Sequence, residues 1–191
     1  SREGKMQENK DRFIELMSRV EREGISDLMQ WLEASDFYRA PASTRFHGSY
    51  EGGLLEHSLN VYDEAVRILS AYPEIDVPEE TLILSTLLHD ACKINMYAVE
   101  KRWRKDDDNI WEQYDTYKHE EKLNYGGHGS KSVFVISHFI KLTTLESVAI
   151  NCHMSSWDGN MSVGNAFTQF PFAWIVHVAD ESATYMREGN Q

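Results

Sequence analysis

The sequence predicts a mostly α-helical protein, a helical bundle with one inserted β-hairpin. Apolar residues recur at helical spacing through most of the 191 positions. The pattern changes to a partial alternation of apolar and charged residues only between about residues 97 and 117. The length suits one domain with one core. We therefore expect a single domain over 1–191, with N-terminal helices in 1–35 packing on the bundle.

Two amphipathic helices open the chain. Residues 6–23 carry apolar side chains at helical spacing among charges, and Gly24 ends this pattern. Ser26 or Asp27 is a suitable N-cap for a second helix that runs to about Ala34. We expect both helices to contribute apolar side chains to the bundle.

The next two helices carry the first candidate functional residues. A turn-rich segment, 36–53, leads into a helix over 54–72 that contains His57. Pro78, followed by acidic residues, opens the next helix, because proline fits the first helical position and negative charge complements the helix dipole. We expect that helix to continue through His89.

The second half of the chain begins with the predicted hairpin. Residues 97–103 and 111–117 partly alternate between apolar and charged side chains, and the polar run 106–109 predicts the turn between them. Three more helices are expected, over 130–141, from Thr143 or Thr144 to His153, and over 172–187 after Pro171.

Composition excludes several functional classes. The net charge of −12 argues against an extended nucleic-acid surface, since such binding depends on many basic contacts to phosphates. The charged first 20 residues and the lack of a long apolar run predict neither a signal peptide nor a membrane span, so a cytoplasmic protein is expected. The two cysteines, Cys92 and Cys152, are expected to be buried free thiols.

A charged group at the end of an apolar run is the first sign of a functional site. The run 85–88 is followed by His89 and Asp90, with Lys93 three residues further on. A buried, unpaired carboxylate would cost several kcal/mol, so Asp90 requires a metal ion or an ion pair. Adjacent helical residues point about 100° apart, so other segments must complete the site. The further candidates in apolar or glycine-rich surroundings are His57, His128, His153 and Asp180.

These residues, in this order, resemble the HD-domain superfamily of metal-dependent phosphohydrolases, whose motif is a lone His, a His-Asp pair and a distant Asp. The resemblance covers residues 45–187, the expected HD core. The stretches GGLLEHSLNV and LLHDACK are similar to the HD-like segment of bacterial 3′-to-5′ exoribonucleases. The family's common His-Asp-Ile-Gly-Lys is here HDACK, in which Cys92 adds a side chain at a crowded turn.

The resemblance implies a metal centre. One ion would be held by His57, His89, Asp90 and Asp180, while His128 and His153 match the additional ligands of binuclear members, in which the Asp of the pair bridges both ions. Imidazole and carboxylate ligands suit Mn, Fe, Co, Ni or Zn, and the sequence leaves both the metal and the choice between one and two ions open.

Two residues, Asp90 and Lys93, are expected to be catalytic at this centre. Asp90 would hold the ions that activate water, so no nucleophilic side chain is required. Lys93 could contact a phosphate oxygen, and its alternative role is an ion pair near the end of the helix.

The expected substrate is a small phosphoester. Trp157 could stack on a base and Asp158 could accept hydrogen bonds from its amino group, although a packed loop tryptophan is the simpler interpretation. We expect a divalent-metal-dependent phosphomonoesterase or phosphodiesterase acting on a nucleotide or another small phosphorylated molecule. Two alternatives stay open, namely an HD-type di-iron oxygenase and a non-catalytic nucleotide-binding module.

Overall fold

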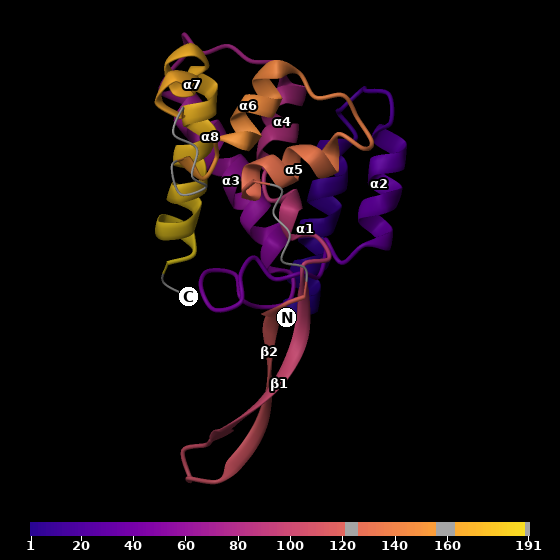
Figure 1. Cartoon of the computed structure of the whole chain (residues 1–191), viewed down its shortest axis with the longest axis vertical. Coiled ribbons are helices and arrows are strands. Elements are labelled where there is room, and N and C mark those ends of the chain that lie inside the picture. Colours follow the sequence, from indigo (N-terminus) through magenta and orange to yellow (C-terminus); the bar gives the residue numbers. More distant parts are fainter. Residues whose placement is uncertain (121–125, 156–162, 190–191) are drawn as a thin grey trace.

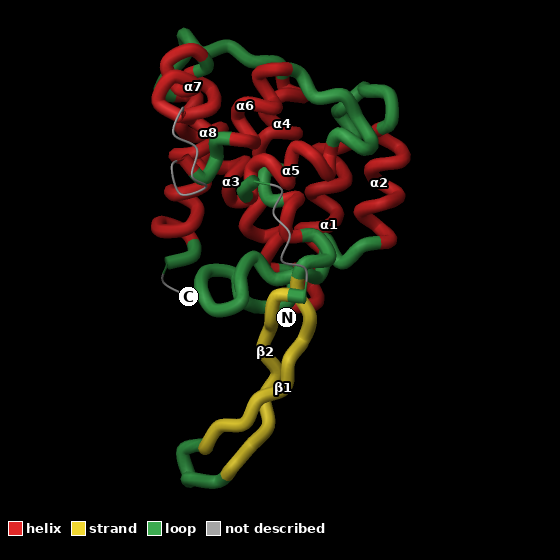
Figure 2. Tube along the Cα trace, viewed as in Figure 1, coloured by secondary structure: helices red, strands yellow, loops and turns green. Residues whose placement is uncertain are grey.

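Helices dominate the computed structural model, which describes residues 1–120, 126–155 and 163–189. The elements in chain order are α1 (Arg2–Met17), α2 (Ile25–Ala34), α3 (Gly53–Ser70), α4 (Glu79–Leu87), the 3-10 turn η1 (Ala91–Lys93), β1 (Tyr97–Lys105), β2 (Trp111–His119), α5 (His128–Ile136), α6 (Thr144–Asn151), α7 (Val163–Gln169), α8 (Pro171–Ser182) and the π-helical turn η3 (Ala183–Arg187). The predicted class, mostly α with one hairpin, is confirmed (Figures 1 and 2). Within the described residues, no helix combines the length and apolar character needed to cross a membrane.

Helix α3 is central because it presents apolar side chains on two faces. Leu55 and Leu59 belong to one core cluster, which also contains Phe13 of α1 and side chains of α2 and α4. Val61 belongs to a second cluster with Phe172 of α8. A helix that is apolar on one face only would lie at the surface, whereas α3 is enclosed by neighbours on both sides. His57 is therefore carried by a helix that is enclosed on two faces.

A buried ionic network joins the N-terminal segment to α6. Glu146 is fully buried, and its carboxylate accepts hydrogen bonds from Arg22 at 2.5 and 3.1 Å and from the Thr81 hydroxyl at 2.8 Å. Glu146 also completes a capping box with Thr143, which identifies the N-cap that the sequence left open between Thr143 and Thr144. With every carboxylate oxygen paired, the burial of this charge is offset.

The structure corrects the expected course of the helix before the His-Asp pair. Helix α4 ends at Leu87 instead of continuing through His89. The carbonyl oxygen of Thr86 accepts hydrogen bonds from both the backbone nitrogen and the Nδ1 atom of His89, at 3.4 and 2.7 Å, so the chain tightens here. His89 and Asp90 consequently lie on a turn between α4 and η1. Adjacent side chains on a helix point about 100° apart, but those on a turn can face the same site.

Two further differences affect the second half of the chain. Helix α7 was not predicted, and α5 ends at Ile136, earlier than the expected end near residue 141. The last helix changes to a π-helical turn at Ala183, where the amide of Glu188 donates to the carbonyl of Ala183 at 3.1 Å. Such turns are rare and often occur at functional sites, because they shift the following side chains around the helix axis.

The hairpin projects away from the bundle as an arm (Figure 1). Strands β1 and β2 pair antiparallel from Tyr97 opposite His119 to Lys105 opposite Trp111. The predicted turn forms around Asp106, whose side chain accepts the amides of two residues that follow it. None of the described residues that line the cavity discussed below comes from this hairpin.

Candidate metal centre

His57 is held from both sides of its ring. Its Nδ1 atom lies 3.0 Å from each carboxylate oxygen of Glu188, and the same carboxylate accepts a hydrogen bond from the Asn60 amide at 3.1 Å. Its Nε2 atom faces Asp180 at 2.9 Å and Asp90 at 3.6 Å. Because an ionised carboxylate only accepts hydrogen bonds, Nδ1 carries a proton toward Glu188, and Nε2 is directed at the two aspartates, where it can carry a proton or bind a cation.

His89 and His153 are oriented in the same way by their own turns. The Nδ1 atom of each donates a hydrogen bond of 2.7 Å to the backbone carbonyl three residues earlier, that of Thr86 and that of Ile150 respectively. In the neutral ring this leaves a lone pair on Nε2. Both Nε2 atoms are buried without a hydrogen-bond partner among the described residues.

Asp90 lies between these histidines. Its Oδ2 atom is 3.2 Å from the Nε2 atom of His89 and 3.6 Å from that of His57, while its Oδ1 atom is 3.3 Å from the Nε2 atom of His153. Asp180 is close to the first two rings, with its Oδ1 atom 3.6 Å from the Nε2 atom of His89. The two oxygens of Asp90 therefore face different histidines.

The donor set fits a divalent cation. Candidate ligand atoms lie within 4.8 Å of one another in the group His57, His89 and Asp90 and in the group His89, His153 and Asp180. Lone pairs of buried imidazoles that face buried carboxylates repel one another unless a positive charge lies between them. Imidazole nitrogen with carboxylate oxygen is a ligand set that Mn, Fe, Co, Ni and Zn accept. The buried His/Asp clusters can thus hold a metal ion.

The shifted pKa values of these side chains also indicate that the cluster favours a positive charge. Burial by itself would lower the pKa of His57, but its contacts with Asp180 and Glu188 raise that pKa to about 9. Burial opposes protonation of His89 as well, and Asp90 and Asp180 raise its pKa to about 10. Conversely, burial would raise the pKa of Asp90, yet His89 and Lys93 hold it well below its usual range. Protons on the histidines supply this charge when no metal is bound.

A cavity of about 260 Å³ opens onto the cluster. Lys93 lines it, and its Nζ atom contacts Oδ2 of Asp90 at 3.1 Å, so the ion pair considered from the sequence is present. His128 lines the same cavity but belongs to neither of the ligand groups above. It reaches this position because α5 approaches α6 closely at Gly129, where a Cβ atom would lie 2.2 Å from the carbonyl oxygen of Asn151.

The remaining predicted residues have different outcomes. Trp157 and Asp158, the candidate base-recognition pair, lie outside the described residues. Cys92 is fully buried, its amide donates to the Ser132 hydroxyl at 3.0 Å, and burial raises the pKa of its thiol to about 12. The Cys side chain is therefore accommodated at the turn, and the expectation of a buried free thiol is confirmed for both cysteines.

Sequence reasoning missed Glu188. It follows Asp180 by eight residues, close to two helical turns, and this spacing is the only signal that could have suggested a shared face. The π-helical turn between the two residues changes the angle between their side chains, and a helical wheel drawn at about 3.6 residues per turn does not include this change. Glu188 is 3% exposed and bonds the ring nitrogen of His57 that faces away from the aspartates.

The contact between Glu188 and His57 leads to a prediction. We expect Glu188→Gln to weaken metal affinity by about 10- to 100-fold, because removing the charge leaves His57 a poorer and less firmly oriented ligand. Calorimetric titration of Mn²⁺ into metal-stripped protein would measure the change. Glu33→Gln, an exposed position on α2, is the matched control. An unchanged affinity in a folded Glu188→Gln protein would contradict the role given to Glu188.

Comparisons with known proteins support the class of enzyme that the site suggests. A dihydroneopterin 2′,3′-cyclic phosphate phosphodiesterase from Methanocaldococcus jannaschii is 32% identical over 81 residues, which are 41% of this chain and 30% of that protein. The chain therefore spans less than a third of this relative. No protein-family model and no solved structure matches the chain. The similarity and the buried His/Asp clusters together fit a metal-dependent phosphohydrolase.

Proposed function

We propose that this chain is an HD-type phosphohydrolase that uses one or two divalent metal ions to hydrolyse a small phosphoester, with residues 45–187 as its HD core. The observation that carries the proposal is the set of Nε2 atoms from His57, His89 and His153 aimed at buried carboxylates beside a cavity. The similarity to a cyclic phosphate phosphodiesterase favours a diester, such as a cyclic nucleotide phosphate, over a monoester.

Each ligand would have a distinct part in holding the metal. His57, His89, Asp90 and Asp180 would hold the first ion. Oδ1 of Asp90 and His153, with His128 at the cavity wall, would hold a second. A divalent ion bound there supplies Lewis acidity, which activates water and offsets the charge that develops at phosphorus. The backbone carbonyls of Thr86 and Ile150 keep two of the rings aimed at the site.

Lys93 would bind a phosphoryl oxygen of the substrate. Burial disfavours its charged form, but Asp90 holds its pKa above the ordinary lysine value, so the ammonium stays charged at neutral pH. It therefore acts as a fixed cation and not as a proton donor or acceptor. In a chain with a net charge of −12, this local charge would attract an anionic ester into the cavity. Base recognition by Trp157 and Asp158, and a cytoplasmic location, stay predictions.

Metal reconstitution tests the proposed activity. Stripped protein given Mn²⁺ or Co²⁺ is expected to hydrolyse an aryl phosphodiester faster than an aryl phosphomonoester. Lys93→Met should retain the metal yet lose about 100-fold in kcat, as expected for the loss of one charge-stabilising donor. Lys101→Met on the exposed hairpin is the matched control.

Other outcomes would replace the proposal with one of its alternatives. Bound iron with oxygen consumption and no ester hydrolysis would identify an oxygenase. Tight nucleotide binding without turnover of any ester would identify a binding module.

A further inference from the structure

A second and larger cavity adjoins the metal centre. It measures about 680 Å³ and shares His47, Thr184 and Tyr185 with the smaller cavity beside the His/Asp cluster. Volumes of this order are typical of sites for small organic ligands. None of the candidate metal ligands named from the sequence lines this larger cavity. Metal binding therefore does not account for it.

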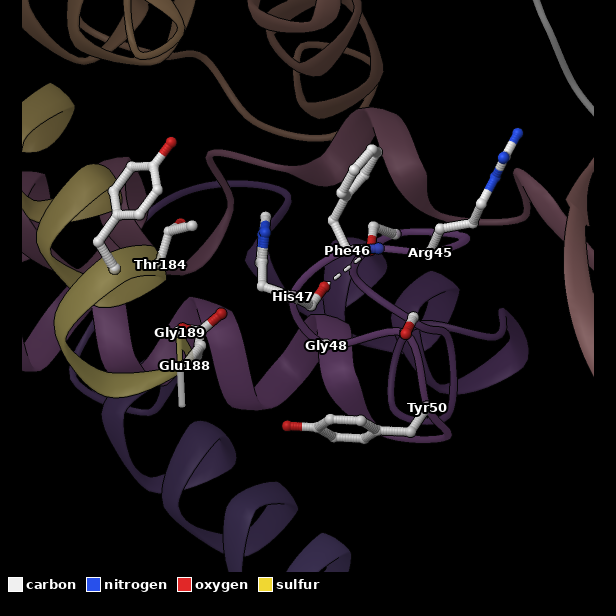
Figure 3. A pocket seen from close by; sticks show the side chains of 11 residues that line it. Arg45, Phe46, His47, Gly48, Tyr50, Thr184, Glu188 and Gly189 are labelled. Atoms are coloured by element: carbon white, nitrogen blue, oxygen red, sulfur yellow. Dashed lines mark hydrogen bonds between the residues drawn. The ribbon is translucent and has the colours of Figure 1, made fainter. Parts of the chain in front are cut away.

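Two of the aromatic side chains that line this cavity are largely exposed and come from different segments of the chain. Phe46 comes from the loop before α3 and is 78% exposed, and Tyr185 comes from η3 and is 70% exposed. Figure 3 shows the ring of Phe46 beside His47, and Tyr185 lines the same cavity next to Thr184 in the chain. We call the part of this cavity that is lined by Phe46, His47 and Tyr185 the ring slot. Large aromatic side chains left this exposed lose the burial that usually stabilises them, which is typical of a binding surface.

Both sides of the ring slot are held in place by hydrogen bonds. The Ser43 hydroxyl accepts from the amide of Phe46 at 2.9 Å and donates to the carbonyl of His47 at 2.8 Å. The loop is seated on α3 at Gly53, where a Cβ atom would lie 2.0 Å from the carbonyl oxygen of Gly48. On the other side, the Thr184 hydroxyl donates to the carbonyl of Asp180 at 2.9 Å. The backbone that carries the two rings is thus held before any ligand arrives, which reduces the entropic cost of binding.

The charges around the ring slot favour a neutral ring on an anionic ligand. Among the described residues, Glu188 is the only acidic one that lines the larger cavity, and its carboxylate is engaged by His57 and Asn60. Arg45 lines the same cavity, and no residue in the described ranges forms an ion pair with it. His47 joins the two cavities, and its buried Nε2 atom has no hydrogen-bond partner among the described residues. His47 therefore lies at the junction of the two cavities, between a ring in the larger one and a phosphate in the smaller one.

We propose that the ring slot binds the planar heterocycle of the substrate while the phosphoryl group lies at the metal centre. This inference rests on the proposed function and specifies its substrate class, namely a phosphoester that carries a purine, pyrimidine or pterin ring. Stacking on an aromatic side chain is available to every such ring, because each has a π face. Phe46 and Tyr185 determine specificity for the ring, and His47 sets its distance from the reacting phosphate.

Matched pairs of esters test the ring slot. The probes are adenosine 2′,3′-cyclic phosphate, dihydroneopterin 2′,3′-cyclic phosphate and, without a ring, methyl riboside 2′,3′-cyclic phosphate. We expect Phe46→Ala and Tyr185→Ala each to raise KM about tenfold more for a ring-bearing ester than for the ring-free ester. The first two probes distinguish a nucleobase from a pterin. Trp103→Ala, which removes a 62% exposed aromatic from the hairpin, is the matched control.

A binding measurement separates this inference from the proposed activity. Calorimetric titration of metal-stripped protein with adenosine 5′-monophosphate and with ribose 5-phosphate should show tighter binding of the ring-bearing compound, and the two variants should remove that difference. If no ester is hydrolysed but the difference persists, the proposed function fails and the ring slot stands. If esters are hydrolysed and the variants affect ring-bearing and ring-free esters equally, the ring slot is overturned.

Discussion

Asp90→Asn should abolish stable metal binding and lower phosphodiester hydrolysis by about 1,000-fold or more. One carboxylate oxygen of Asp90 contacts His89 and Lys93, and the other contacts His153. Replacing this side chain therefore changes contacts on both sides of the cluster. An amide keeps the shape but removes the charge, and it directs an N–H₂ group at either a lysine ammonium or a histidine. A loss of several kcal/mol in transition-state stabilisation corresponds to this factor.

Metal content and kcat, measured together, would check this result. Asp107→Asn in the exposed turn of the hairpin is the matched control, since it makes the same chemical change in a segment from which no described residue lines the cavity. Circular dichroism would confirm that the Asp90→Asn protein keeps its helices. Full metal content and normal hydrolysis in that protein would rule out the site described here.

The metal-stripped protein should lose stability as the pH rises from about 7 to 10. The pKa of His57 is raised to about 9 and that of His89 to about 10 in the folded protein, from an ordinary value near 6.5. A raised pKa stabilises the fold fully below the unfolded value and loses this contribution as the pH passes the folded value. Deprotonation leaves imidazole lone pairs facing the carboxylates of Asp90 and Asp180 without a compensating charge.

Stability should also fall on the acid side. The carboxyl pKa values of Asp90 and Asp180 are held well below the usual range against the effect of burial, by His89 in the first case and by His57 and His89 in the second. Depressed carboxyl pKa values stabilise the fold above the unfolded pKa, and that contribution is lost as the pH falls. The stripped protein is therefore expected to be most stable between these two limits.

Thermal unfolding with and without Mn²⁺ across this pH range would test the argument. A divalent ion replaces the protons, so the alkaline loss should disappear when the metal is bound. At a free metal concentration 100 times Kd, the metal should add about 2.7 kcal/mol. For a chain of this size that corresponds to a rise in Tm of about 5 to 10 °C. An alkaline profile that metal does not change would show that these histidines are not the ligands.

Much of this architecture could be predicted from the sequence because it depends on local patterns. Apolar spacing of 3 and 4 residues predicted the helices of the bundle, including α3 with His57, and alternation around the 106–109 turn predicted the hairpin. The thermodynamic cost of burying Asp90 also made a partner for its carboxylate necessary, whatever the fold around it. These are properties of short segments, and neighbouring residues are sufficient to determine them.

Tertiary structure alone decided how these segments meet. The contact between Glu188 and the ring of His57 joins residues 131 positions apart, so it depends on how the end of the chain packs against α3. Phe46 and Tyr185 are 139 positions apart, so no local pattern could place both at one cavity. The sequence by itself therefore determined which residue types are available for a metal centre. Packing between distant segments determined their distances, their orientation and the cavity they share.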